Sequence, residues 1–274
     1  MSCPRKWHIN AKDTIMSNDS IKADVQANFG AHAQAYVTSA SHARGDDLAR
    51  LIEMTEAKSD WLVLDVATGG GHTGLALVPL VQQVIALDLT EAMLHAARAH
   101  AETKGAQIRY TAGDAELLPF AEGTFDLVTC RIAPHHFPNI DAFVQESSRV
   151  LKAGGVLVIQ DHLLPDSKKA GRYVDAFEKL RDPSHVRGYA SYEWRKLYES
   201  AGFAVEHTET YVKAHDLVSW AERMGCDAVT IERLQVMLLR APVKAAAWLD
   251  AKYAGTEAAT FANHHILIRG RKPS

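Results

Sequence analysis

Short β-rich runs alternate with helical patterns from about residue 60 to residue 163, and no other feature constrains the fold as strongly. Five runs have strand-like composition: residues 61–67, 83–89, 108–114, 125–132 and 155–162. Helical signals lie between them, at residues 73–81, 90–105 and 141–155. Such alternation is typical of βαβ units on a parallel sheet. We therefore expect an α/β, doubly wound, Rossmann-like core that binds ligands at the carboxyl ends of its strands.

The remaining sequence extends this core at both ends. Residues 21–57 are predicted to be helical, and a helix at 191–203 precedes a strand at 204–214. Helical stretches follow at 216–225, 230–240 and 242–254, before a last strand at 264–272. We expect one domain over 21–274, with its core at 58–163 and a helical cap inserted at about 216–260. Residues 1–20 are polar and aperiodic, which predicts a disordered tail whose first fifteen residues are dispensable.

Composition excludes several classes of protein. The net charge is −3 and no Lys/Arg cluster forms a basic stripe, so nucleic acid is not an expected partner. The three cysteines lie far apart without a CxxC pair, which favours a reducing, cytoplasmic setting. No apolar run reaches the roughly 20 residues of a membrane span. The expected partner is a small molecule, and the oligomeric state stays open.

The loop after the first predicted strand, LDVATGGGHTG at residues 64–74, has the glycine spacing of a dinucleotide site through Gly69, Gly71 and Gly74. Asp65, however, ends the strand beside that loop. A carboxylate there repels a pyrophosphate and attracts a cationic ligand. A nicotinamide-dependent oxidoreductase remains an alternative, because it rests on the glycine spacing alone.

Two further acids follow the next strands. Asp88 ends the second strand, where a carboxylate can accept both hydroxyls of a ribose. Asp114 ends the third strand and could accept an exocyclic amine. Any one of these acids could merely cap a turn. Three acids at successive strand ends indicate a ligand that combines a positive charge with a nucleoside.

Four segments together resemble a known family: VLDVATGGGHTGLAL, VIALDLTEAML, GDAELLPFAEGTFDLVTCRIAPHHFPN and RVLKAGGVLVIQDHLLP. They are similar to the class I S-adenosylmethionine-dependent methyltransferases of the type 11 group, especially the YcgJ-like branch related to ubiquinone/menaquinone C-methyltransferases. The resemblance implies a seven-stranded, mostly parallel sheet with an antiparallel last strand. It also implies S-adenosylmethionine, whose sulfonium and ammonium are cationic, as the cofactor.

The resemblance assigns cofactor contacts by position. The expected cofactor-binding residues are Tyr36 in an N-terminal lid, Asp65, Ala67, Gly69, Gly71, Asp88, Leu89, Met93, Asp114, Ala115 and Arg131. Ala67 departs from the family pattern, which has a glycine there. An alanine is acceptable at this position if its φ is negative.

Candidate catalytic residues lie after the fourth strand, in CRIAPHHFPN. A neutral histidine can take a proton at pH 7, so His135 and His136 are candidate bases, although a histidine pair in a loop often only bonds the backbone. The candidate acceptor contacts are His162, Arg181, Trp220 and Met224, each of which could equally be structural.

The sequence predicts metal-independent C- or O-methylation of a small molecule. The segment RIAPHHF lacks the motif used for amino-group methylation of bases. No HExxH or similarly spaced ligand set occurs, so we expect no metal. The alternative is a non-methylating S-adenosylmethionine-binding protein or isomerase on the same fold, because fold does not fix function.

Overall fold

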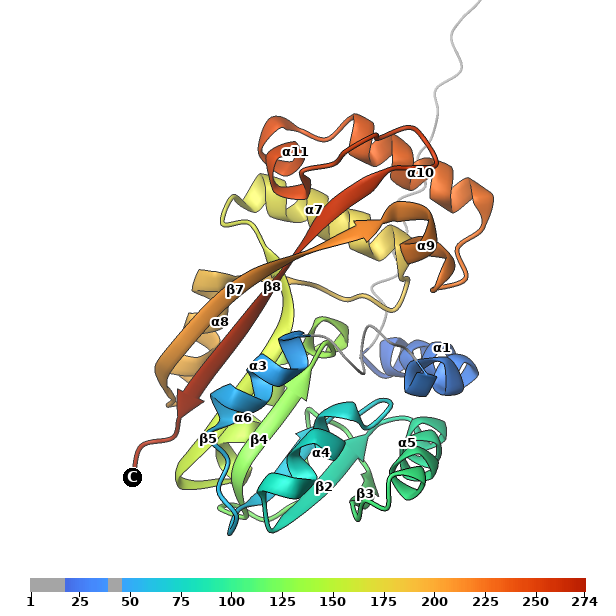
Figure 1. Ribbon diagram of the computed structural model, residues 1–274. Helices are drawn as coiled ribbons and strands as arrows, with labels where there is room; N and C mark the ends of the chain where they lie inside the picture. Colours follow the sequence, from blue (N-terminus) through green and yellow to red (C-terminus); the bar gives the residue numbers. More distant parts are fainter. Residues whose placement is uncertain (1–17, 39–45) are drawn as a thin grey trace, which may run out of the picture.

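A single sheet organises the protein, in the strand order β3-β2-β1-β4-β5-β8-β7 (Figure 1). The computed structural model describes residues 18–38 and 46–274. The strands are β1 (Leu62–Val66), β2 (Gln83–Asp88), β3 (Arg109–Ala112), β4 (Phe125–Arg131), β5 (Leu151–Leu164), β7 (Ala204–Asp216) and β8 (Thr260–Arg271). The first five are parallel, and β8 is antiparallel to both of its neighbours. The short β6 (Tyr189–Ala190) pairs with the end of β5. The predicted doubly wound, mostly parallel sheet is confirmed.

Alternate residues of each central strand face opposite layers of helices. Leu64 and Val66 belong to one apolar core, whereas Val63 belongs to the other. The first core includes side chains of α6 (Ile140–Val150) and α8 (Ser191–Ser200), and the second includes α3 (Asp46–Thr55) and α4 (His72–Leu77). A strand that is buried on both faces needs apolar residues at nearly every position, and this explains the continuous apolar runs in the sequence.

A third apolar core lies at the far end of the long strands β7 and β8. It joins α7 (Lys168–Arg181), α9 (Leu217–Glu222), α10 (Ala228–Leu239) and α11 (Val243–Leu249), which cluster together in Figure 1. Three of these helices fall within the stretch predicted as a helical cap. The division of the chain into core and cap remains a prediction.

Helix α1 (Asn18–Thr38) packs beside α5 (Glu91–Thr103) near the ends of β2 and β3 (Figure 1). α1 begins before residue 20, where the predicted tail was expected to end; the rest of that tail lies outside the described residues. Among the helices that the structure describes, none is long and apolar enough to cross a membrane.

One predicted boundary is wrong. The helix expected at 141–155 ends at Val150, and β5 begins at Leu151. Leu151 has extended backbone angles and pairs with Phe125, and Gly154 donates its amide to the Lys272 carbonyl at 3.0 Å. The two glycines therefore belong to an irregular start of the strand and do not cap the helix.

Gly270 provides a test of this packing. A Cβ at this position would lie 2.5 Å from Cδ1 of the buried Tyr198, so alanine must displace a packed ring. We predict that Gly270→Ala lowers the free energy of unfolding by about 1–3 kcal/mol in urea denaturation. Gly30→Ala is the control, because a Cβ there meets only an ordinary contact at 3.7 Å inside a helix, and stability should stay unchanged or rise. Equal stability of Gly270→Ala and the unmodified protein would contradict the packing.

Candidate active site

The glycine loop turns the chain from β1 into α4. Gly71 is the N-cap of α4 with φ of 80°, and a Cβ there would lie 3.1 Å from the Cβ of Ala97 on α5. Gly69 has φ of 52°, and a Cβ on it would meet no atom within 4 Å. Both glycines thus adopt a left-handed backbone, and Gly69 leaves space open where a ligand can approach the main chain.

Ala67 corrects the expectation of a negative φ, because its φ is 52°. A left-handed alanine is strained by about 1–2 kcal/mol relative to a right-handed one. Ile132, which follows β4, also has φ of 52°. Its side chain is β-branched, so a positive φ strains it more than it strains Ala67. The two strained residues border the same cleft. Such strain persists only where the surrounding structure enforces it.

Asp65 is the most enclosed of the three strand-end acids, with 1% of its surface exposed. Its carboxylate accepts hydrogen bonds from the hydroxyls of Thr68 at 2.6 Å and Thr129 at 2.8 Å. Burial raises the pKa of Asp65 to about 6, although these bonds and the Gly74 amide oppose the rise. A buried carboxylate with a raised pKa is stabilised by a cationic ligand.

Asp88 connects the glycine loop to the end of β2. One carboxylate oxygen accepts the Gly69 amide at 2.9 Å, and the other accepts the Thr90 amide at 2.9 Å. Burial raises its pKa despite these bonds. Each carboxylate oxygen has a second lone pair, so Asp88 can still accept two hydroxyls.

Asp114 is paired with a lysine that the sequence analysis missed. Lys22 of α1 donates to Asp114 at 2.7 Å and to Glu116 at 2.6 Å. Gln26 donates to the Leu89 carbonyl at 2.9 Å. These contacts fix α1 over the strand ends. The side chain of Tyr36, the predicted lid residue, is outside the described part of the chain.

Arg131 lies at the end of β4 in a buried ion pair. It pairs with Asp47 of α3 at 2.8 Å and donates to Gln160 at 3.1 Å. Burial opposes ionisation of Asp47, but the charge and hydrogen bonds of Arg131 outweigh it and hold the pKa well below its ordinary value. Asp47 also pairs with Lys213 at 2.9 Å, so its single negative charge is shared between two cations.

These residues surround one cleft that opens to solvent. Nine predicted cofactor residues line it: Asp65, Ala67, Gly69, Asp88, Leu89, Met93, Asp114, Ala115 and Arg131. Lys22, Val25 and Phe29 of α1 cover one side, and Ile132, Ala133, His136, Phe137 and Pro138 form the end beyond Arg131. Gly71 shapes the loop from behind. Three carboxylates and an open glycine in one cleft fit S-adenosylmethionine, although the individual contacts remain predictions.

The two candidate bases have different positions. Both lie in the short helix η2 (Pro134–His136), but only His136 lines the cleft, where its ring meets the edge of Phe29 at a centroid distance of 4.9 Å. His135 is buried behind it, bonded to Asp161 through Nδ1 at 2.6 Å and stacked on His162 at 4.4 Å. Burial lowers the pKa of both residues, that of His135 further.

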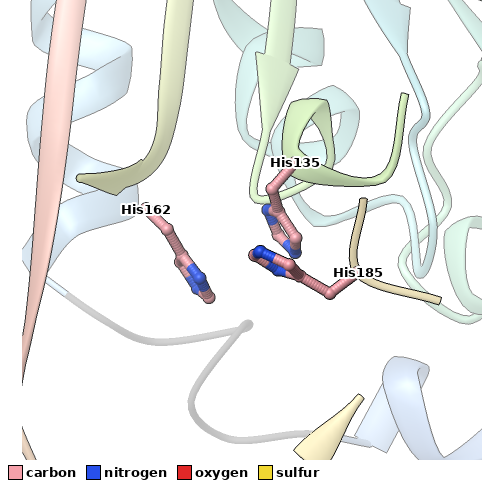
Figure 2. Close-up of side chains that lie close together, drawn as sticks. All are labelled: His135, His162 and His185. Carbon is pink, nitrogen blue, oxygen red and sulfur yellow. The ribbon is translucent and has the colours of Figure 1, made fainter. Parts of the chain in front are cut away.

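The four candidate acceptor residues do not line the described cleft. His162 lies in the histidine cluster behind η2 (Figure 2). Trp220 is buried in the third apolar core against Phe177, with the Arg181 guanidinium over its ring at 4.4 Å. Met224 is half-buried at the end of α9. Their roles as acceptor contacts remain predictions.

The strain at Ala67 can be measured. We predict that Ala67→Gly raises the free energy of unfolding by about 1 kcal/mol, since relief of the left-handed strain exceeds the added entropy of the unfolded chain. The control is Ala133→Gly in the same cleft, where φ is −140° and the substitution should destabilise. If both variants lose stability in urea denaturation, Ala67 is not strained.

Comparisons with known proteins agree with this geometry. Residues 64–159 match the family model described as a methyltransferase domain. The uncharacterized methyltransferase YcgJ of Bacillus subtilis is 36% identical over 201 residues, which cover 73% of this chain and 79% of the relative. Its crystal structure superimposes with a TM-score of 0.80 over 84% of this chain and 99% of YcgJ. A candidate methyltransferase of Bacillus halodurans C-125 gives a TM-score of 0.81 at 38% identity, over 84% of this chain and 100% of that protein.

A more distant relative names an acceptor. The ubiquinone/menaquinone biosynthesis C-methyltransferase UbiE of Pseudomonas putida is 33% identical over 131 residues, or 46% of this chain and 51% of UbiE. With the fold, the cleft and a relative matched over most of its length, the chain belongs to the S-adenosylmethionine-dependent methyltransferases with a type 11 methyltransferase domain.

Proposed function

We propose that this protein transfers a methyl group from S-adenosylmethionine to a carbon or oxygen atom of a small, apolar acceptor bound beside His136. The supporting observation is that one cleft extends from the three strand-end acids to η2. Residues on both sides of Arg131 line this cleft, so a cofactor bound at the acids leaves the η2 end for a second molecule.

The acids divide the work of binding the cofactor. The Asp65 carboxylate attracts the positively charged end, and Asp88 accepts the ribose hydroxyls through its remaining lone pairs. Asp114 and the Ala115 amide recognise the adenine edge. In this arrangement Lys22 leaves Asp114 when the amine of the base takes its place.

The end of the cleft around η2 suits an apolar acceptor. Phe29, Ile132, Phe137 and Pro138 contribute apolar surface there. S-Adenosylmethionine supplies a methyl group that is already activated on a sulfonium. The protein therefore needs mainly to align the acceptor and exclude water, which can contribute about 7–11 kcal/mol.

His136 is placed to take a proton from the acceptor. Its Nδ1 lies 3.0 Å from the Ser184 carbonyl, and a carbonyl only accepts, so Nδ1 carries the hydrogen. The Nε2 lone pair is then available as a proton acceptor. Asp182 lies 4.0 Å from Nε2 and stabilises the imidazolium that forms. His135, the other predicted base, is not on the cleft and acts through His136.

The first acceptors to test are quinol-like rings. UbiE is named for C-methylation in ubiquinone and menaquinone biosynthesis, and it is 33% identical to this chain over 131 residues. An electron-rich ring carbon loses a proton on methylation, which gives His136 a task. Release of S-adenosylhomocysteine together with a methylated ring separates this function from the non-methylating alternative.

The affinity for S-adenosylmethionine should depend on pH. Protonation of Asp65, whose pKa is about 6, removes the negative charge that attracts the cofactor. Affinity for S-adenosylmethionine should therefore fall as the pH drops below about 6, by up to about tenfold per pH unit. Isothermal titration calorimetry between pH 5 and pH 7.5 measures this. Asp65→Asn should bind more weakly at pH 7.5 and lose the pH dependence, and a persistent dependence in Asp65→Asn would assign it to another group.

Turnover should depend on His136, the proposed proton acceptor. His136→Ala should lower kcat by about 10²–10⁴-fold, with less than about a threefold change in the Kd for S-adenosylhomocysteine. His95→Ala is the control, because His95 is exposed on α5, and it should leave both constants unchanged. His135→Ala should lower kcat through the position of His136. If both His135→Ala and His136→Ala retain full turnover, the protein contributes alignment alone.

A further inference from the structure

Three histidines from distant parts of the chain meet behind η2. His135 lies in η2, His162 on β5, and His185 in the segment between α7 and β6. One ring nitrogen from each lies within 4.8 Å of the corresponding nitrogens of the other two (Figure 2). The rings of His135 and His162 are stacked, and those of His135 and His185 are 5.3 Å apart. Imidazole nitrogens this close can bind one metal ion together.

Carboxylates orient two of these rings from outside. Asp161 accepts a hydrogen bond from Nδ1 of His135 at 2.6 Å, and Asp175 accepts one from Nε2 of His185 at 2.8 Å. When a cation is bound, each carboxylate is ionised and only accepts, so the hydrogen of each ring faces its carboxylate. The opposite nitrogen then carries the lone pair. Carboxylate–histidine pairs of this kind are the usual outer support of metal-bound histidines.

The same region contains buried polar atoms without partners. Nδ1 of His162 and Oδ2 of Asp161 make no hydrogen bond with any described residue. Among these residues, the ion pair of Asp161 is with His135, and Nδ1 of His162 is 3.9 Å from Glu178. A buried polar group without a hydrogen-bond partner destabilises the fold. Buried carboxylates and free imidazole nitrogens together are stabilised by a cation that binds nitrogen.

We propose that His135, His162 and His185 bind one divalent transition-metal ion, of which Zn²⁺ fits best. Three imidazoles match the three protein ligands of zinc sites that keep a fourth position open. Mg²⁺ and Ca²⁺ prefer oxygen ligands, so a nitrogen-only set disfavours them. This site departs from the expectation of no metal, which rested on sequence spacing.

The metal site lies next to the acceptor end of the cleft. The ring of His135 is 4.1 Å from that of His136, which lines the cleft. A metal held by β5 and by the segment before β6 fixes η2, and with it the cleft wall that contains His136. The inference does not depend on methyl transfer, because metal binding is measured without cofactor or acceptor.

The experiment measures metal binding by the full-length chain. Chelator-treated protein is titrated with ZnCl₂, CoCl₂ and MgCl₂ by calorimetry, and bound zinc is counted by mass spectrometry after dialysis. We expect one Zn²⁺ per chain, a higher Tm with Zn²⁺, and no response to Mg²⁺. Co²⁺ should give the intense visible absorption of a site with four ligands.

Variants locate the ion. His162→Ala and His185→Ala should each weaken Zn²⁺ binding by more than about tenfold, and Asp175→Asn by about 10–100-fold through loss of outer support. His207→Ala is the matched control, because His207 also pairs with a carboxylate, Glu209 at 2.6 Å, but is exposed on β7. It should bind Zn²⁺ normally.

Two results would overturn the site. One is the absence of Zn²⁺ binding by the unmodified protein. The other is binding that survives His185→Ala and Asp175→Asn with unchanged affinity, which would place the ion on surface histidines. Circular dichroism establishes that the variants are folded, and if a histidine variant fails to fold, Asp175→Asn decides the outcome.

Discussion

The parallel register of four strands is the constraint on which the site depends. β1 pairs with β2 and β4, and β2 pairs with β3, so their carboxyl ends meet along one edge of the sheet. In this register Asp65 lies opposite Thr129, which donates to it, and Asp88 reaches back to the amide of Gly69. A slip of one residue would turn these side chains into the apolar layers. The packing of the central strands into the two cores thus also fixes the positions of the acids.

Burial at this edge of the sheet shifts the pKa values of its carboxylates. Asp65 and Asp88 carry raised pKa values because they are enclosed, whereas Asp47 is held ionised by Arg131. The structure satisfies one buried charge with an internal partner and leaves two carboxylates facing the cleft. A cofactor that brings positive charge and hydroxyl groups stabilises that arrangement. The same logic applies behind η2, where buried carboxylates and histidines meet.

Much of the fold and half of the site could be predicted from local sequence. Strand-like runs, helix patterns and acids at strand ends are local signals, and Asp65, Asp88 and Asp114 follow from them. The other cofactor residues follow from the resemblance to the family. All of them line the cleft except Gly71, which lies just behind it, and Tyr36, whose side chain is not described. Other features depend on tertiary packing. The positive φ of Ala67 and the early end of the helix at Val150 follow from tertiary context.

Contacts between residues far apart in the sequence could not be predicted from local patterns. Lys22 of α1 forms an ion pair with Asp114, which follows β3. The ring of His185, in the segment after α7, lies beside that of His135. No spacing rule links residues from three separate elements. The sequence therefore contains no motif that predicts the histidine cluster. Trp220 and Met224 show the converse, because a helical stripe of large apolar residues predicts burial without saying against which surface.

The most direct test of the central claim is a crystal structure of the protein with S-adenosylhomocysteine. The account predicts the ammonium end near Asp65, the ribose hydroxyls on Asp88, and the adenine amine on Asp114 with Lys22 displaced. It also predicts that the sulfur faces the end of the cleft that contains His136. A ligand bound outside this cleft, or with its adenine beside His136, would contradict the account.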